Sequence, residues 1–270
     1  MTLREQSAAS VRVATFNTHH GTAPDGRPAL DACLRLLDDL APDVIALQEV
    51  DRGWRRSGFA DQPARYAEGL GGRALFAANL RLPAEDDPAQ GGAVRGSRAA
   101  AREYGTVLLT RHPILRAAHH PLPVPHGAEP RGVQVALIDV RGVPIRVAGV
   151  HLHDGDDAVS ARQAEEVLRR LAADEAAPGA PEAPEVVLGD LNAEPGRGGH
   201  RVLLDAGFAD AWAIAGTGPG RTFVDPESGS GARIDHVLVR GAAIVSARVG
   251  SLVPTPSDHE PLIVEISPRG

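Results

Sequence analysis

The chain has 270 residues, of which 43% are hydrophobic, so it is long and apolar enough to bury a sizeable core. Its single cysteine, Cys33, excludes an internal disulfide and a multi-cysteine zinc site. The formal net charge of −7 disfavours a protein that holds long nucleic acid through a broad basic surface, although it leaves room for a local positive groove.

The N-terminus and the apolar runs bear on where the protein resides. Residues 1–10 contain no apolar segment of signal-peptide length, and no later run is long enough to span a bilayer. We therefore expect a cytoplasmic protein without a transmembrane segment, or a secreted one if a signal peptide has been removed from the sequence. Residues 1–10 are expected to form a disordered tail ahead of a single domain over residues 11–267.

Apolar runs and amphipathic stretches alternate along the chain. The strand candidates are near-continuous apolar runs, which suit strands covered on both faces. They lie at residues 11–16, 44–47, 107–109, 133–140, 145–150, 186–188 and 262–264. Helical spacing of apolar residues predicts helices at 28–40, 62–70 and 157–173. This order predicts a layered α/β fold with helices outside and sheets inside.

Turn and loop signals separate these elements. Turn residues at 111–113 and 141–142 predict hairpins, and hence antiparallel as well as parallel pairing. Residues 174–184 are interpreted as a Pro/Ala surface connector. Residues 81–101 show no periodicity, and they are interpreted either as a lid that faces a substrate or as a solvated insertion.

Oxygen-bearing side chains follow several of the predicted strands. Asp190 and Asn192 come directly after the run 186–188, and because they are two residues apart in an extended segment they project to the same side. A carboxylate and an amide carbonyl aimed together suit Mg²⁺ or Mn²⁺. Singly, such residues are more often turn formers or helix caps. The full candidate metal set is Asn17, Glu49, Asp190, Asn192 and Asp258.

Two histidines extend this set with groups that transfer protons. His151 follows the strand 145–150, and His259 stands next to Asp258. An imidazole held by a carboxylate can take a proton from water near neutral pH, and Asp235 is the candidate carboxylate because it begins a strand. His151 is interpreted either as a donor to a phosphoryl oxygen or leaving group, or as an ordinary strand-end histidine.

The chain resembles the endonuclease/exonuclease/phosphatase superfamily, which includes deoxyribonuclease I, exonuclease III-type enzymes and neutral sphingomyelinases. The motifs that carry the resemblance occur in the family's order, and they span most of residues 11–266. They are Thr15-Phe16-Asn17, Gln48-Glu49-Val50, Tyr104-Gly105, His151-Leu152, Gly189-Asp190-Leu191-Asn192-Ala193, Arg233-Ile234-Asp235-His236 and Ser257-Asp258-His259-Glu260-Pro261-Leu262.

The resemblance implies a four-layer α/β/β/α sandwich of two packed mixed sheets with outer helices. It also implies that metal-activated water hydrolyses a phosphate ester. Asn17 and Glu49 would bind or orient Mg²⁺, with Mn²⁺ as a substitute, and Asp258 would complete the metal environment. Asp190 and Asn192 would hold the attacking water and the phosphate.

The remaining roles that the resemblance implies surround the phosphate. His259, oriented by Asp235, would be the general base or would stabilise the phosphate, and His151 would lie on the other side of the phosphorus. Tyr104 would hydrogen-bond the phosphate, although some members lack this tyrosine. Arg131 is interpreted either as a phosphate clamp or as a solvated side chain.

The leading hypothesis is a monomeric, Mg²⁺-dependent phosphoric ester hydrolase, specifically a phosphodiesterase. Its substrate would be a small molecule, a lipid head group or nucleic acid. The acidic balance and the aromatic content of only 3% favour a small or lipid-derived diester. The alternatives are a DNA endonuclease, such as a repair enzyme, and a catalytically silent scaffold that binds phosphate. The scaffold is the least favoured because the complete ligand set is present.

Overall fold

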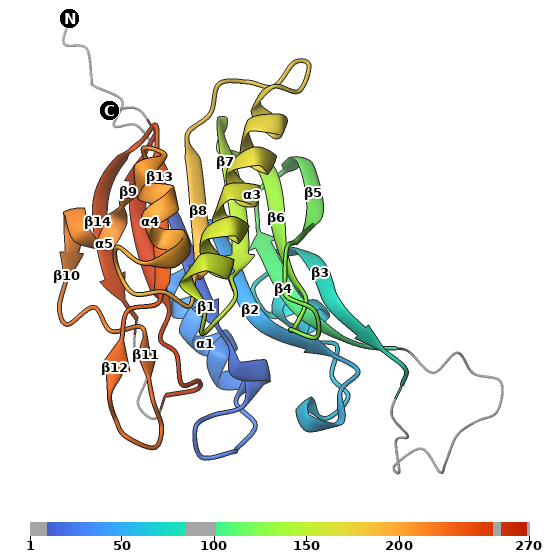
Figure 1. Cartoon of the computed structure of the whole chain (residues 1–270). Helices are drawn as coiled ribbons and strands as arrows, with labels where there is room; N and C mark the ends of the chain where they lie inside the picture. The colour runs from blue at the N-terminus through green and yellow to red at the C-terminus, as the bar shows by residue number, and fades with distance from the viewer. Residues whose placement is uncertain (1–9, 85–100, 251–254, 269–270) are drawn as a thin grey trace, which may run out of the picture.

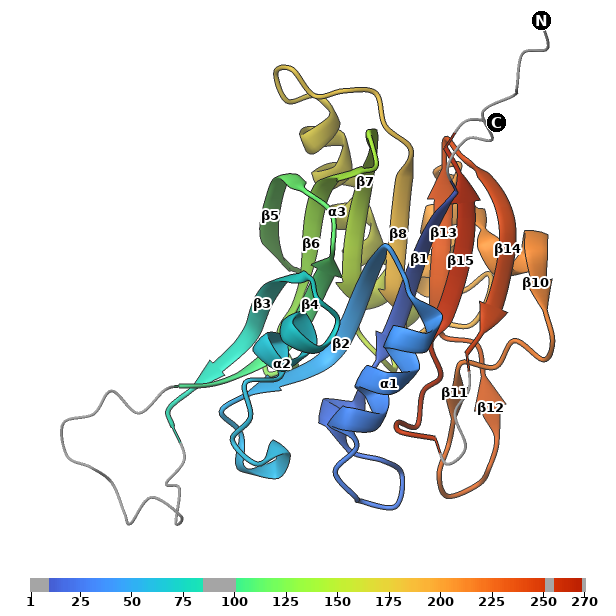
Figure 2. The ribbon, with the colours of Figure 1, turned by 180° about the vertical axis from the view of Figure 1, so that it is seen from behind.

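The computed structural model describes residues 10–84, 101–250 and 255–268. Two sheets pack face to face and helices cover their outer faces, as Figure 1 and Figure 2 show from opposite sides. The predicted four-layer α/β/β/α sandwich is therefore confirmed. In the described parts of the chain, no helix is both long and apolar enough to cross a membrane. The predicted disordered tail lies outside the described residues, apart from Ser10.

The first sheet has seven strands, and α1 (Leu30–Leu40) and α2 (Gln62–Gly69) cover its outer face. In spatial order the strands are β10 (Gly216–Thr217), β14 (Ala243–Val249), β15 (Leu262–Ser267), β1 (Val11–Asn17), β2 (Val44–Arg52), β4 (Arg102–Thr110) and β3 (Arg73–Leu82). Between helices and sheet lies an apolar cluster that includes Phe16, Leu37 and Ile45. Cys33 belongs to this cluster and is fully buried.

The second sheet has six strands, and α3 (Asp157–Glu175) and α4 (Gly198–Asp205) cover its outer face. In spatial order the strands are β5 (Ile114–Leu122), β6 (Arg131–Val140), β7 (Val143–His151), β8 (Glu185–Asp190), β13 (Asp235–Arg240) and β9 (Ala209–Asp210). Fully buried side chains such as Val13 from one sheet and Val147 and Leu188 from the other fill the space between the sheets.

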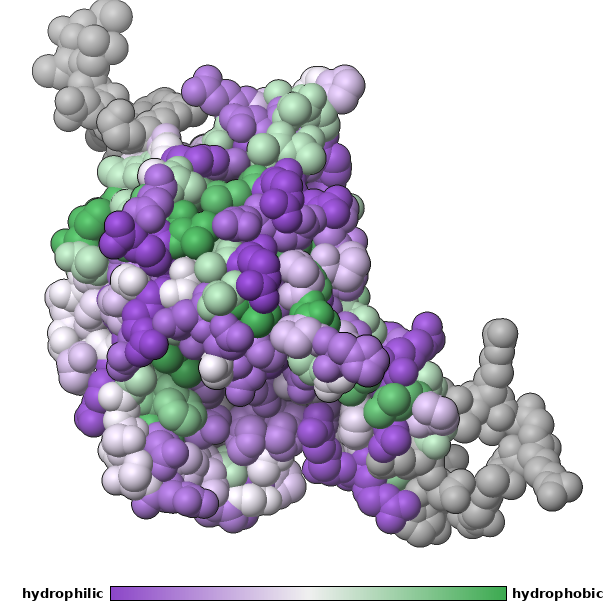
Figure 3. All heavy atoms as spheres, viewed as in Figure 1, coloured by the Kyte–Doolittle hydropathy of each residue, from purple (hydrophilic) through white to green (hydrophobic). Residues whose placement is uncertain are grey.

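Smaller elements lie at the ends and edges of the sandwich. Helix α5 (Ala211–Ala215) contacts β13 and β14. A two-stranded hairpin of β11 (Phe223–Val224) and β12 (Gly231–Ala232) projects at the lower end in Figure 1, where the turns η1 (His19–Gly21) and η2 (Arg55–Ser57) also lie. Figure 3 shows the face seen in Figure 1. Most residues on that face are hydrophilic, and apolar residues gather toward α5 and β14.

Two predictions from the sequence are wrong: a hairpin at 111–113 and the start of the loop at 81–101. The turn at 111–113 is not a hairpin, because β4 belongs to the first sheet and β5 to the second. The turn at 141–142 does form the predicted hairpin between β6 and β7. Strand β3 extends to Leu82, so it includes the start of the predicted loop 81–101, and residues 85–100 of that loop lie outside the described residues.

Strand directions bring the polar strand ends to one edge of the sandwich. β7 and β8 run parallel, and β13 runs antiparallel to β8, so the ends of β7 and β8 lie beside the start of β13. In the first sheet the end of β1 lies beside β2 and beside the start of β15. Both sheets therefore present their chemical groups at the same edge.

Gly189 is required just before this edge. A Cβ built on Gly189 would lie 2.0 Å from the Val150 carbonyl oxygen of β7, and its φ is +156°. We expect Gly189→Ala to lower the free energy of unfolding by about 3 kcal/mol, because the two paired strands would have to separate. Urea unfolding measures this loss.

Gly149 in the neighbouring strand is the matched control. A Cβ there would meet Ala46 Cβ at 3.4 Å, which is an ordinary contact. Gly149→Ala should therefore cost clearly less than Gly189→Ala, and equal losses would show that the close approach of β7 and β8 is not the constraint.

Candidate functional site

Asn17, at the end of β1, joins carboxylates from both sheets. Its Nδ2 donates hydrogen bonds to Glu49 Oε1 at 3.0 Å and to Asp190 Oδ2 at 3.1 Å. Its Oδ1 accepts a hydrogen bond from the His19 N–H at 3.0 Å. Asn17 is buried, so these bonds form away from bulk solvent. The amide therefore holds two carboxylate oxygens near a single point.

Glu49 projects from an irregular point in β2. The pairing of β2 with β4 shifts register between Leu47 and Val50, and Glu49 has a φ of +57°. A non-glycine residue in the left-handed region costs conformational energy, so such a residue persists only where its surroundings hold it. Thr18 Oγ1 lies 3.0 Å from the Gln48 carbonyl oxygen and 3.2 Å from the Glu49 carbonyl oxygen, so its proton is shared between them, while Asn17 holds the Glu49 side chain.

Three strands of the second sheet place His151, Asp190 and Asp235 in a row. Asp190 pairs in register with His151 on one side and with Asp235 on the other. His259 approaches from the loop before β15, with Nδ1 2.8 Å from Asp235 Oδ2 and Nε2 3.8 Å from Asp190 Oδ2. One ligand atom from each of Asp190, Asp235 and His259 lies within 4.8 Å of the others.

The environment of His151 defines which of its nitrogens carries a proton. Arg131 NH1 lies 3.1 Å from His151 Nδ1, and a guanidinium can only donate, so Nδ1 is the acceptor. Burial and the charge of Arg131 keep the pKa of His151 well below its ordinary value, so the ring is neutral. Its proton is therefore on Nε2, which lies 3.6 Å from Asp190 Oδ2. Arg131 NH1 also pairs with Glu129 and the side chain is buried, so Arg131 is not a solvated side chain; its Nε has no hydrogen-bond partner within the described part of the chain.

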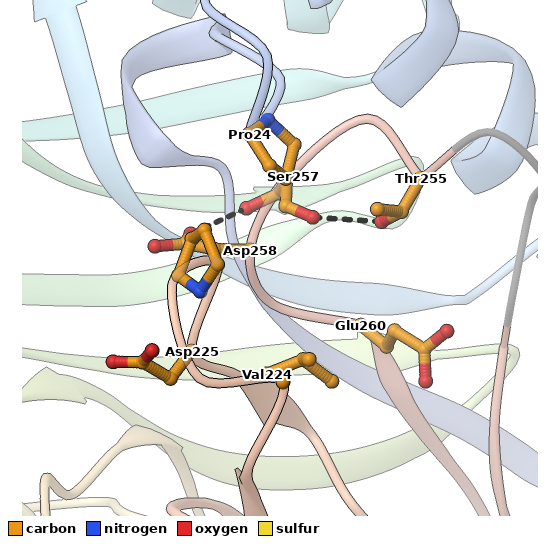
Figure 4. A pocket seen from close by; sticks show the side chains of 9 residues that line it. Pro24, Val224, Asp225, Thr255, Ser257, Asp258 and Glu260 are labelled. Carbon is orange, nitrogen blue, oxygen red and sulfur yellow. Dashed lines mark hydrogen bonds between the residues drawn. The ribbon is translucent and has the colours of Figure 1, made fainter.

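Asp258 is positioned by Ser257 (Figure 4), to which the sequence alone assigned no role. Ser257 Oγ donates to the Asn17 carbonyl at 2.9 Å and lies 3.2 Å from Asp258 Oδ1. The same oxygen accepts the His259 N–H at 3.1 Å. His19 Nδ1 lies 3.8 Å from Asp258 Oδ1. One buried hydroxyl thus ties the segment before β15 to the end of β1.

The other two predicted residues lie at the border of this group. Asn192 has a φ of +49°, and its N–H donates to Asp190 Oδ1 at 2.8 Å. Its Nδ2 donates to the Leu152 carbonyl at 3.0 Å, which directs Oδ1 the other way. Tyr104 of β4 is buried, and burial together with the charge of Glu49 raises the pKa of its hydroxyl, which therefore stays protonated and able to donate.

Crowding of charge shifts the pKa values of this group. Burial raises the pKa of Glu49, but the His20 imidazole, 3.7 Å away, and the Asn17 amide outweigh it, so the pKa lies below its ordinary value. Burial and the neighbouring Asp235 raise the pKa of Asp190 to about 7. Burial opposes a charged His259, yet Asp235 raises its pKa to about 10.

This donor set fits a hard divalent cation. Glu49 Oε1 and Asp190 Oδ2 share one hydrogen-bond donor, so carboxylates of different sheets converge. The side chain of Asp258 is 17% exposed and adds a third carboxylate. The buried Asp235 Oδ1 has no hydrogen-bond partner within the described part of the chain. Carboxylate oxygens are the ligands that Mg²⁺ and Mn²⁺ prefer, and a cation would relieve the repulsion that raises the pKa of Asp190.

A second cluster of metal-type side chains, His200, Asp210 and His236, has a different character. The Gly196 N–H donates to His200 Nδ1 at 2.9 Å, so the ring proton is on Nε2, which donates to Asp210 Oδ2 at 3.1 Å. Arg233 donates to both oxygens of Asp210 at 2.9 and 3.1 Å. His200 and Asp210 are thus already fully engaged.

His236 completes this second cluster. Its Nε2 lies 2.8 Å from the Ala193 carbonyl oxygen and donates to it, while its Nδ1 accepts from Arg233 NH1 at 3.0 Å. Burial and the charges of His200 and Arg233 lower the pKa of His236 to about 3, so the ring is neutral. Every ring nitrogen is therefore used in hydrogen bonds, and the cluster anchors the backbone directly after Asn192 instead of offering a metal site.

The pKa of His259 predicts a pH dependence of stability in protein treated with EDTA. A histidine whose pKa is raised from 6.5 to about 10 contributes stability that is complete below pH 6.5 and is lost as the pH rises through 10. Asp190 acts in the same direction between its ordinary 3.8 and about 7, and Cys33, whose pKa burial raises from 9.0, acts in the same direction above pH 9, so the range from 7 to 9 isolates His259. The urea midpoint should fall over that range.

His259→Gln should flatten this slope, because glutamine does not titrate. The exposed His126 is the matched control, and His126→Gln should keep the wild-type slope. A wild-type midpoint that stays constant or rises between pH 7 and 9 would contradict the ion pair of His259 with Asp235.

Comparisons with solved structures agree with this architecture. An endonuclease/exonuclease/phosphatase from Beutenbergia cavernae is 26% identical, with 96% of this chain and 71% of that chain covered and a TM-score of 0.71. A mannosyl-6-phosphatase from Bacteroides thetaiotaomicron is 16% identical, with 95% and 99% covered and a TM-score of 0.70. The human Nocturnin catalytic domain is 18% identical, with 96% and 93% covered and a TM-score of 0.67.

The comparison with curated proteins finds no match. The family described as the Endonuclease/Exonuclease/phosphatase family matches residues 14–259, which spans β1 to His259 and thus the whole candidate site. The chain therefore belongs to the endonuclease/exonuclease/phosphatase family.

Proposed function

We propose that this protein is a phosphodiesterase that uses a divalent metal, with Mg²⁺ as the preferred ion. Members of the family are generally hydrolases that act on phosphate esters, with a divalent metal. The observation that carries the proposal is the convergence of Glu49 and Asp190 on one amide of Asn17, between the imidazoles of His151 and His259. Negative ligands for a cation and polar donors for a phosphate thus meet at one edge.

The carboxylates of Glu49, Asp190 and Asp258 would hold the metal. When bound, the cation supplies positive charge to the phosphoryl oxygens. Asn17 presents its amide nitrogen to the carboxylates, so we assign it an orienting role and not that of a metal ligand. Asn192 would direct Oδ1 to the attacking water or the phosphate, because its nitrogen is used on Leu152.

We assign different catalytic roles to the two histidines and to Asp190. The neutral His151 donates from Nε2 to a phosphoryl oxygen. His259 is protonated beside Asp235, so we assign it to stabilising the charge of the phosphate, and not to the base. Asp190, whose Oδ2 lies 3.6 Å from His151 Nε2 and 3.8 Å from His259 Nε2, is then the carboxylate that would orient the attacking water and accept its proton.

The charge balance around the site supports a diester as the substrate. A phosphate monoester carries up to two negative charges and needs more positive charge to bind it than a diester with one. The nearby guanidiniums of Arg131 and Arg56 are already paired, with Glu129 and Asp51 respectively. A singly charged diester therefore suits the site better than a monoester.

Hydrolysis of bis(p-nitrophenyl) phosphate tests the proposal. We expect turnover with Mg²⁺ or Mn²⁺ that EDTA abolishes, and slower hydrolysis of p-nitrophenyl phosphate. Asp190→Asn and His259→Gln should each lower kcat at least about 100-fold, because proton transfer and charge stabilisation are lost. Release of p-nitrophenolate reports the rate.

Matched controls replace exposed residues of the same types. Asp205→Asn and His126→Gln should leave kcat within a factor of about two, since both side chains face solvent. Wild-type activity in Asp190→Asn would remove the assigned role of Asp190. Turnover that survives complete removal of metal would contradict the metal-dependent mechanism.

A further inference from the structure

Two consecutive histidines, His19 and His20, form the turn that follows β1, beside the carboxylates of the candidate site. The φ of His19 is +44° and that of His20 is +45°, so both lie in the left-handed region that residues other than glycine seldom adopt. Seven such residues occur in the described part of the chain, and four of them belong to this site: His19, His20, Glu49 and Asn192. Backbone strain of this kind gathers at functional sites, so the turn calls for a functional explanation.

A buried glutamine holds this turn against the strand that carries Glu49. Gln62 of α2 donates from Nε2 to the His20 carbonyl at 2.7 Å. Its Oε1 accepts the N–H of Asp51, in β2, at 2.9 Å. The backbone of His20 and the strand of Glu49 are therefore tied to one side chain, which fixes the place of the His20 ring beside the Glu49 carboxylate.

The His20 ring presents an uncommitted nitrogen to Glu49. Its Nδ1 is buried, has no hydrogen-bond partner among the described residues, and lies 3.7 Å from Glu49 Oε2. Asn17 donates to the other oxygen of that carboxylate, Oε1. A buried polar atom without a partner is costly, and a native protein keeps one where a function or a bound ion accounts for it. His20 Nδ1 and Glu49 Oε2 are therefore two neighbouring atoms that are both available to a third group.

The neighbouring His19 does not offer such a nitrogen to the carboxylates. Its Nδ1 lies 3.1 Å from the Thr22 carbonyl oxygen, and because a carbonyl only accepts, this nitrogen carries a proton and donates. The same Nδ1 is the atom that faces Asp258 Oδ1, at 3.8 Å. His19 thus turns a protonated nitrogen to its carboxylate, whereas the nitrogen that His20 turns to Glu49 is free to bind an ion.

The spacing of His20 Nδ1 and Glu49 Oε2 suits joint coordination of one cation. Ligand atoms lie about 2.1 Å from a small divalent ion, so two atoms on the same ion are at most about 4.2 Å apart. The observed 3.7 Å is within this limit and is longer than a hydrogen bond. The side chains of His20 and Glu49 are 18% and 23% exposed, so an ion reaches both atoms from solvent.

A nitrogen ligand changes which ions a carboxylate site favours. Mg²⁺ is a hard cation that takes oxygen ligands, whereas imidazole nitrogen suits transition metals. Oxygen ligands alone, from Glu49, Asp190 and Asp258, would distinguish Mn²⁺ from Mg²⁺ only weakly. One imidazole in the set increases the affinity for Mn²⁺ more than the affinity for Mg²⁺.

We propose that His20 is a ligand of the metal that Glu49 holds, through Nδ1, and that it raises the affinity of the site for Mn²⁺ relative to Mg²⁺. The proposal rests on the proposed function, because it adds a nitrogen ligand to the metal of the same site. It accounts for the strained backbone of the turn and for the buried nitrogen without a partner.

Electron spin-echo envelope modulation of bound Mn²⁺ tests this ligand directly, because a coordinated imidazole adds the frequencies of its ¹⁴N nucleus to the echo decay. Wild-type protein treated with EDTA and loaded with Mn²⁺ alone should show the imidazole signal, and His20→Asn should lose it. Asparagine tolerates the left-handed backbone, so we expect this variant to keep the turn. Its urea midpoint checks that it folds.

His19→Asn is the matched control, since it makes the same replacement at the neighbouring left-handed position. This variant should keep the imidazole signal. A wild-type spectrum without imidazole nitrogen would overturn the proposal. A signal that persists in His20→Asn, or one that is lost equally in His19→Asn, would also overturn it.

Calorimetric titration of Mn²⁺ and of Mg²⁺ measures the consequence for ion selectivity. The ratio of the Mn²⁺ affinity to the Mg²⁺ affinity should fall at least about fivefold in His20→Asn and change less than about twofold in His19→Asn. The ratio cancels any general weakening of the site. An unchanged ratio in His20→Asn would contradict the proposal.

Hydrolysis of bis(p-nitrophenyl) phosphate separates this proposal from the proposed function. An imidazole signal that depends on His20, in a protein that hydrolyses no diester, would support the ligand and refute the phosphodiesterase. Hydrolysis by a protein whose bound Mn²⁺ shows no imidazole signal would overturn the ligand and keep the proposed function. Absence of both Mn²⁺ and Mg²⁺ binding to the wild type would overturn both.

Discussion

Mutual repulsion between carboxylates is the main constraint on the candidate site, at the edge of the sandwich where both sheets present polar strand ends. Glu49, Asp190 and Asp235 are brought together by strands of both sheets; Asp190 and Asp235 are buried and Glu49 is partly buried, so water screens their charges poorly. Neighbouring polar side chains offset part of this repulsion. Asn17 donates to two of the carboxylates, and His259 forms an ion pair with the third. A divalent cation is the group that would balance the charge that remains.

Backbone geometry supplies the precision that this arrangement needs. The pairing register of β7, β8 and β13 sets His151, Asp190 and Asp235 side by side, and the register depends on the close approach at Gly189. In the first sheet the bulge at Glu49 turns a carboxylate out of the regular alternation of β2. The site thus depends on strand pairing for most of its residues, while the loop before β15 supplies Asp258 and His259. The hydrogen bonds of His236 fix the backbone directly after Asn192.

Much of the fold and of the candidate group could be predicted from the sequence, because continuous apolar runs and amphipathic periods are strong local signals. α1 begins within two residues of its predicted start, and Asp235 does begin a strand. β3 was missed because it is a half-exposed edge strand rich in alanine, which has low β propensity. α4 was missed because it opens with glycines and has no side-chain cap. Contacts between distant segments, such as Arg131 on His151, have no local signal at all.

The most direct test of the account is a calorimetric titration of Mg²⁺ and Mn²⁺ into the wild type and Glu49→Gln, after treatment with EDTA. Asn17 and Asp190 stay in place in this variant, and only one carboxylate charge is removed. The account predicts saturable binding to the wild type and at least about tenfold weaker binding to Glu49→Gln. Absence of binding to the wild type, or equal affinity in both proteins, would contradict it.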